Sequence, residues 1–356
     1  ESSTYGFFNN DDFLDIAYTT SYSTKIFYTY GNEIKTLNKI HEISFGELSS
    51  HHTKTPIKSG DINNDGLDDL ILYKNIEANE KIFLLLSNNS SFSDPISIED
   101  NPGSISVDLK IADFNNDNKL DIIIAYQNGT VKLFLNQIAE SSNQTNFLEV
   151  DLISNSSFIQ QIEIIDFNSD NKKDLILLFS NEQEVGIFEG DAVNKVSLAK
   201  TLTLPYWSSS FTLGDLTNDG LLDIAFAYYN DALIGIYENE TAYSFTHSTI
   251  PLSVNNSTGI SPILCADLNT DGRNDLVVGT NTGGLIFAFN QNSTYSLQER
   301  FTPSTSTFKG IESAIFNNDN TDDLFIYGSA AMLIPFNDLL KEQPEYLAQN
   351  NGARQG

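Results

Sequence analysis

Short apolar runs separated by polar breaks recur along the whole chain. In one stretch, the run 122–126 is followed by an Asn128-Gly129 break and a second run over 130–135, and the same order returns over 276–289. The runs are rich in β-branched and aromatic residues, and turn-forming dipeptides join them, which is typical of strands in hairpins. The pattern therefore predicts an all-β protein.

A polar motif interrupts this pattern seven times. In its fullest form it reads D-x-N-x-D-G-x-x-D followed by Leu, and its final Asp recurs at intervals of 48 to 54 residues. The copies occupy 7–15, 61–69, 113–121, 166–174, 215–223, 267–275 and 315–323, and the first and last are degenerate. A period near 50 residues indicates tandem structural units.

Each unit is expected to hold four strands, because an apolar run such as 106–112 precedes each motif and three runs follow it. A single sheet of this size cannot bury both of its faces, so neighbouring sheets must stack. Seven such sheets around an axis form a β-propeller. We expect residues 1–340 to form a seven-bladed propeller of four-stranded antiparallel blades, and 341–356 to be a polar tail or linker.

Closure of the last blade is a separate question. The run at Ser2 to Phe7 precedes the first motif and is therefore a first strand, which leaves no spare strand at the N-terminus. We expect the fourth strand of the seventh blade to come from the tail, near 346–349, or to be missing from this chain.

The position and period of the motif resemble the FG-GAP and VCBS repeats of the integrin α-subunit N-terminal head, and the T-cell immunomodulatory protein family is similar. The resemblance extends from about Tyr5 to Phe336, although the Phe-Gly and Gly-Ala-Pro signatures are mostly absent. It implies an adhesion or receptor-type head that binds a protein partner.

The motif places hard oxygen atoms at alternate positions of a tight loop, which suits Ca²⁺ with its six to eight oxygen ligands. Gly or Asn at the sixth position allows the positive φ of such a turn. We expect about five calcium ions, held by side chains at positions one, three, five and nine and by the carbonyl at position seven. The expected ligands are Asp61, Asn63, Asp65, Leu67, Asp69, Asp113, Asn115, Asp117, Lys119, Asp121, Asp166, Asn168, Asp170, Lys172, Asp174, Asp215, Thr217, Asp219, Leu221, Asp223, Asp267, Asn269, Asp271, Arg273 and Asp275.

Some copies are weaker candidates. Thr217 is a poorer oxygen donor than Asn, and Phe7 and Ile315 stand where the terminal copies should have their first Asp. An EF-hand is excluded because its twelfth position needs Glu, whereas the five complete copies have apolar residues there.

The charge of the chain limits its partners. It carries 48 acidic and 19 basic residues, a net charge of −29, which argues against nucleic acid and against anionic membranes. The apolar runs are far shorter than the roughly 18 residues of a membrane span, so we expect no membrane insertion.

Catalysis is not expected either. The four His residues are accompanied by no nucleophile elbow, zinc motif or phosphate-binding loop. Cys265 is the only cysteine and lies in an apolar run, so we interpret it as a small buried hydrophobic residue.

The partner surface is expected opposite the motif loops. Aromatic candidates there are Tyr206, Trp207, Tyr228 and Tyr229, while tyrosines that recur after second strands, such as Tyr73, are interpreted as structural. We expect a calcium-stabilised extracellular or cell-surface binding module for a protein ligand, because weak calcium sites fill only where calcium is near millimolar. A lectin-like propeller that binds glycans is the alternative, and a polysaccharide-acting enzyme ranks third.

Overall fold

The structure is a computed structural model. It describes residues 2–19, 25–29, 41–44, 56–76, 79–89, 91–100, 104–139, 145–154, 157–241, 243–252, 259–292, 294–301, 308–315, 321–328 and 331–334. The regular elements of these residues are all β-strands, which confirms the all-β prediction. No helix in this part of the chain is long and apolar enough to cross a membrane. The predicted tail lies outside the described residues.

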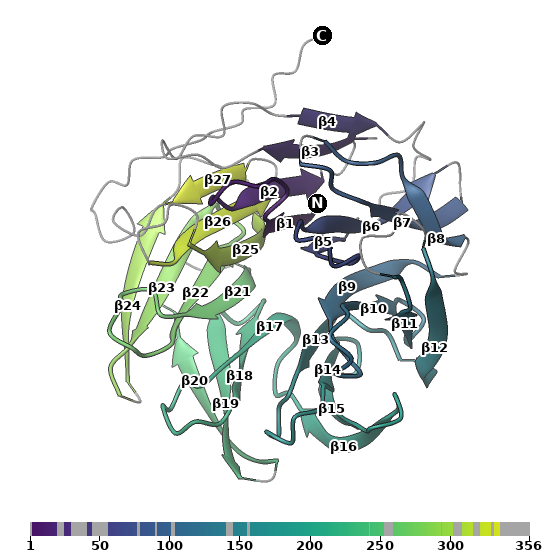
Figure 1. The fold of residues 1–356 in the computed structure, drawn as a ribbon. Helices are drawn as coiled ribbons and strands as arrows, with labels where there is room; N and C mark the ends of the chain where they lie inside the picture. The colour runs from purple at the N-terminus through teal and green to yellow at the C-terminus, as the bar shows by residue number, and fades with distance from the viewer. Residues whose placement is uncertain are drawn as a thin grey trace. The chain divides into compact units, whose positions relative to one another are not determined.

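The first of two compact units, residues 1–33 and 37–202, contains four antiparallel sheets of four strands, drawn from purple to teal in Figure 1. Within each sheet the strands follow one another in chain order. The strands are β1 (Ser2–Gly6), β2 (Asp15–Thr19), β3 (Lys25–Thr29), β4 (His41–Ser44), β5 (Ile57–Gly60), β6 (Asp69–Ile76), β7 (Asn79–Leu85), β8 (Ile96–Asp100), β9 (Ser106–Ala112), β10 (Asp121–Tyr126), β11 (Thr130–Asn136), β12 (Phe147–Ser154), β13 (Gln161–Ile165), β14 (Asp174–Phe179), β15 (Glu184–Gly190) and β16 (Val196–Thr203).

The second unit, residues 34–36 and 203–356, contains two further four-stranded sheets and one sheet of three strands, drawn from green to yellow. The strands are β17 (Ser208–Gly214), β18 (Asp223–Tyr228), β19 (Leu233–Thr241), β20 (Ser244–Pro251), β21 (Ile260–Ala266), β22 (Asp275–Thr280), β23 (Gly284–Asn290), β24 (Tyr295–Phe301), β25 (Phe308–Ala314), β26 (Asp323–Gly328) and β27 (Ala331–Ile334).

The sheets stack as the blades of a propeller do. Within the first unit, β1, β5, β9 and β13 contact one another in succession, and β17, β21 and β25 do so within the second. The second strand of a blade is then covered on both faces, so all six residues of β10, β18 and β22 are buried. Fourth strands such as β20 are largely exposed.

The apolar core lies between successive blades. One cluster joins Ile71 and Tyr73 of β6 to Ile122 and Ile124 of β10, and all four side chains are fully buried. Burying each such side chain contributes about 1.5–3 kcal/mol, which explains why the repeats stack. The full burial of Tyr73 confirms that this recurrent tyrosine is structural.

The prediction of an all-β propeller with four-stranded antiparallel blades is confirmed for six blades, but the prediction of seven such blades is wrong. Among the described residues the last blade has only β25, β26 and β27. The segment 346–349, expected to supply its fourth strand, lies outside them. Strand β1 is a first strand, as expected, and pairs only with β2 within its sheet.

Candidate metal centre

The first six motifs form the loops between the first and second strands of their blades. We number the positions of each motif from one to nine, so that the ninth residue opens the second strand, as Asp69 opens β6. In the five complete copies the sixth residue has positive φ, for example 94° at Gly66 and 65° at Asn118, as expected. The fourth residue of these copies is also left-handed, with φ of 53° at Asn64 and 58° at Thr270, which the sequence pattern did not indicate.

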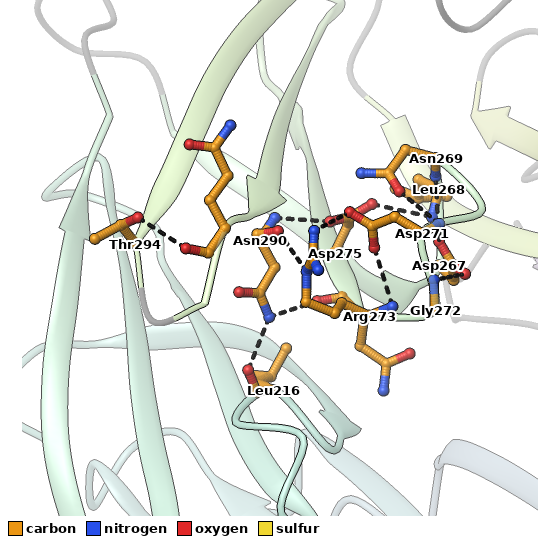
Figure 2. A network of polar contacts seen from close by, with 12 residues as sticks. Leu216, Asp267, Leu268, Asn269, Asp271, Gly272, Arg273, Asp275, Asn290 and Thr294 are labelled. Atoms are coloured by element: carbon orange, nitrogen blue, oxygen red, sulfur yellow. Dashed lines mark hydrogen bonds and ion pairs between the residues drawn. The ribbon is translucent and has the colours of Figure 1, made fainter.

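Side-chain oxygens at positions one, three and five organise the loop backbone. In the loop 61–69, Asp61 Oδ1 and Oδ2 accept the N–H groups of Asp65 and Gly66 at 2.9 and 2.8 Å. Asn63 Oδ1 also accepts from Asp65 N, and Asp65 Oδ1 accepts from Leu67 N, at 3.1 and 3.0 Å. The loop 267–275 repeats this arrangement (Figure 2). The predicted ligands at these positions are therefore brought together on each loop.

The carboxylate at position nine has a different environment. Asp275 is fully buried; its Oδ2 accepts from Leu268 N at 3.1 Å and its Oδ1 from Asn290 N, at the end of the third strand, at 2.7 Å (Figure 2). The same pair of bonds is made by Asp69, Asp121, Asp174 and Asp223, all fully buried. The ninth residue therefore fastens the loop to the third strand of its own blade.

Burial changes the acidity of these groups. It raises the pKa of Asp69 to about 7 and those of Asp121, Asp223 and Asp275 to about 6, against the opposing effect of the backbone donors. The pKa of Asp174 is raised for the same reason.

An asparagine after the third strand extends the network to the preceding blade. Asn290 Nδ2 donates to the carbonyl of Leu216 at 2.8 Å and to that of Asn274 at 3.1 Å (Figure 2). Asn136 makes the same contact in the first unit, with Ile62 O at 2.7 Å. The recurrence of Asn at 136, 239 and 290 is the sequence signal for this role.

The donor set of the loops fits a hard cation. A carboxylate offers about four lone-pair positions, so a bond to one N–H leaves each oxygen able to bind a metal. In the loop 215–223, Thr217 Oγ1 is buried and has no hydrogen-bond partner among the described residues, so this oxygen is able to bind a cation. Asp215 and Asp219 flank Thr217 in the sequence and supply the carboxylates at positions one and five.

A cluster of three or more His, Cys, Asp or Glu side chains placed to hold a metal does not occur in the described part of the chain. The physical reason is that position three is an amide or hydroxyl and position nine faces the backbone. Calcium at these loops stays a prediction. In the first copy, Phe7 at position one is 44% exposed and supplies no side-chain oxygen.

The aromatic candidates in the second unit are only partly where they were expected. Tyr206 is 37% exposed, and half-buried Trp207 packs edge-on against Tyr229 with ring centroids 5.7 Å apart. Tyr228 is fully buried, so its predicted contact with a partner is wrong. Its ring lies in the blade interior, and its hydroxyl is 3.3 Å from Nε2 of His247.

Comparison with known proteins agrees with this geometry. Residues 61–124, 113–177, 166–226 and 215–278 match the FG-GAP-like repeat, and together these segments cover more than half of the chain. Each match begins at the first residue of a motif and extends beyond the following motif. No relative was found among curated protein sequences.

Solved structures share the fold at low sequence identity. A protein from Lactobacillus plantarum has a TM-score of 0.66 and 14% identity, with 94% of each chain covered. A lectin from Agrocybe aegerita, which recognises non-reducing terminal N-acetylglucosamine, has a TM-score of 0.65 and 15% identity, with 93% of this chain and 89% of the lectin covered. BBS1N in complex with ARL6DN has a TM-score of 0.57 and 10% identity, with 89% and 84% covered.

Proposed function

Because the chain belongs to the FG-GAP-like repeat family, we propose that it is a calcium-stabilised binding module rather than an enzyme. The observation that carries the proposal is the repeated oxygen arrangement of the loops. Carboxylates stand at positions one and five of all five complete copies, with an amide or hydroxyl at position three. This donor set is the kind that Ca²⁺ prefers.

About five ions would be held, one by each complete copy. The side chains at positions one, three and five and the carbonyl at position seven are the proposed donors, and the ninth carboxylate supports them from the buried side. Bound calcium would offset the mutual repulsion of the loop carboxylates. Its role is therefore to stabilise the blades, not to carry out chemistry.

Thermal melting tests this proposal. Calcium at about a hundred times the dissociation constant of a site should add about 2.7 kcal/mol per site to the free energy of unfolding. The melting temperature should therefore rise when calcium replaces a chelator, and magnesium at the same concentration should have a smaller effect. Identical melts in calcium and in chelator would refute calcium stabilisation.

The ligand of the module is proposed to be a protein. Tyr206, Trp207 and Tyr229 offer exposed or half-buried aromatic surface in the second unit, and aromatic residues often dominate protein interfaces. BBS1N, a structure of the same fold, was crystallised in complex with a protein.

We propose that the module works outside the cytosol, since sites of this type fill near millimolar calcium. Submicromolar dissociation constants for calcium would contradict that location.

Glycan binding is the second candidate, and the Agrocybe aegerita lectin, which covers most of this chain, supports it. A glycan array with calcium-loaded protein separates the two. Binding to one sugar family that is lost in Trp207→Ala would favour a lectin-like function, and the absence of glycan binding would favour a protein ligand. Leu148→Ala is the matched control, because Leu148 is an exposed apolar residue, 50% accessible, on β12 of the first unit.

A further inference from the structure

The five complete loops differ at position seven in a way that matters for a cation. Leu67 and Leu221 occupy this position in two loops, and Lys119, Lys172 and Arg273 occupy it in the others. The basic side chains do not all behave alike, so the loops are not equivalent.

Two of the basic side chains fold back onto their own loop. Lys172 Nζ lies 2.8 Å from Oδ2 of Asp170, the carboxylate at position five. The guanidinium of Arg273 makes the same contact with Oδ2 of Asp271 through Nη2. In both loops Oδ1 of the same carboxylate already accepts the N–H of position seven, at 2.9 Å for Lys172 and 3.0 Å for Arg273.

Arg273 is held more firmly than Lys172. Its Nε also donates to the carbonyl of Asn290 at 3.1 Å, so the planar group is fixed at two points (Figure 2). The Lys172 side chain is 40% exposed, and its ammonium group contacts Asp170. That contact also lowers the pKa of Asp170.

Lys119 provides an internal comparison. Its ammonium group donates to Ile138 O at 2.7 Å. Oδ2 of Asp117 in that loop instead accepts from the neutral amide of Asn115 at 3.0 Å, as Asp65 accepts from Asn63. A cation at position seven therefore neutralises the fifth carboxylate in two loops only.

We propose that Lys172 and Arg273 are internal counter-ions that compete with calcium, so that the loops 166–174 and 267–275 bind it more weakly than the loops 61–69, 113–121 and 215–223. Calcium must displace the Lys172 ammonium or the Arg273 guanidinium group from the carboxylate at position five. The bound ion is then still repelled by the positive charge of that side chain nearby. The loop with Arg273 is the weakest, because two bonds hold the guanidinium. This inference rests on the proposed calcium binding.

The effect should be measurable, because calcium must separate a positively charged side chain from a carboxylate before that carboxylate can bind it. We expect affinity to differ by about tenfold between the two kinds of loop. Equilibrium dialysis of the full chain against fixed free calcium should then show about three ions bound at concentrations where the loops 166–174 and 267–275 are still mostly empty.

Substitutions test the assignment. Arg273→Met should raise the number of ions bound at the intermediate concentration by about one, and Lys172→Met should do the same to a smaller extent. Lys119→Met is the matched control, since it removes the same charge from the same position without freeing a carboxylate.

The outcomes separate the two proposals. If wild-type protein binds no calcium, the proposed function fails and this inference fails with it. If wild type binds calcium but Arg273→Met and Lys119→Met give equal shifts, or Arg273→Met gives none, the counter-ion assignment alone is overturned. Should Arg273→Met fold poorly, Lys172→Met still decides the matter, because equal shifts in Lys172→Met and Lys119→Met would contradict the proposal.

Discussion

Within the motif, single residues have separable tasks. The carboxylates at positions one and five lie at the loop surface, whereas the carboxylate at position nine is enclosed by backbone N–H groups. Substitutions at the two kinds of position should therefore fail in different ways. Substitutions at positions one and five should remove the stabilisation by calcium, whereas substitutions at position nine should destabilise the protein with or without calcium.

The ninth position is tested by Asp275→Asn. The amide keeps the shape but can accept only one of the two N–H bonds, from Leu268 and Asn290, so one buried donor loses its partner. We expect a loss of about 2–4 kcal/mol in the free energy of unfolding, measured by urea denaturation in chelator. Asp219→Asn, at an exposed position five, is the control and should change it by less than about 0.5 kcal/mol. Equal losses of unfolding free energy in Asp275→Asn and Asp219→Asn would show that positions nine and five do not differ in this way.

The thiol of Cys265 should react slowly in the folded protein. Burial raises the pKa of its thiol to about 12, with a further contribution from the negative charges of Asp275, Asp223 and Asp215. At pH 8 the thiolate fraction should be about a thousandfold below that of a free cysteine, and a disulfide reagent should react correspondingly slowly. Reactivity should increase as pH rises towards 12 or when urea unfolds the chain. Rapid labelling of the folded protein at pH 8 would show that this thiol is not shielded.

At the scale of strands and loops, the end of β17 packs against the next blade. A Cβ added at Gly214 on β17 would contact Sγ of Cys265 on β21, and also Nδ2 of Asn274 at 3.3 Å. Gly214→Ala should therefore destabilise the protein by about 1–3 kcal/mol in urea denaturation. Cys265→Ala in the same chain should recover part of the loss. Ala266 occupies the equivalent position of the following blade, and Ala266→Gly is the matched control with a smaller expected effect.

An ion pair also joins the strands of two neighbouring blades. Lys110 Nζ on β9 lies 2.8 Å from Oε1 of Glu163 on β13, within the first unit. Burial acts to lower the pKa of Lys110, but Asp108 and Glu163 together hold it above its ordinary value. The pair therefore stays ionised and ties two first strands together.

Much of the architecture could be predicted from the sequence because hydrophobic period and turn chemistry act locally. The motif loops, the strand order and the burial of Tyr73 follow from those rules. The double role of Asp275 could not be predicted, since its partner Asn290 is fifteen residues away and is brought close only by pairing of the second and third strands. Tyr228 closes β18 as Tyr126 closes β10, so the recurrence that indicates a structural role for Tyr73 applies to Tyr228 as well, and its burial agrees with that role.

For the molecule as a whole, the motif explains much of its acidity. Positions one, five and nine hold nineteen of the 48 acidic residues, and the net charge is −29. In the absence of a bound cation, the loop carboxylates at positions one and five repel each other across distances that salt can screen.

Ionic strength should therefore substitute partly for calcium. In chelator, the melting temperature should rise as sodium chloride is increased from about 20 mM to about 500 mM, because the Debye length falls below the spacing of the loop charges. Calcium-loaded protein is the control and should respond less, since its loop charges are already offset. Equal responses of the two forms would show that loop repulsion does not limit stability.

The buried aspartate that opens every second strand also affects how such chains are recognised. All seven copies keep it, including Asp15 and Asp323 in the terminal copies, where Phe7 and Ile315 have replaced the leading Asp. A blade can thus lack the leading carboxylate and still keep its buried aspartate. Searches that score the leading positions would overlook such blades, and the family match here ends at residue 278. A search anchored on the aspartate that opens the second strand would count all seven.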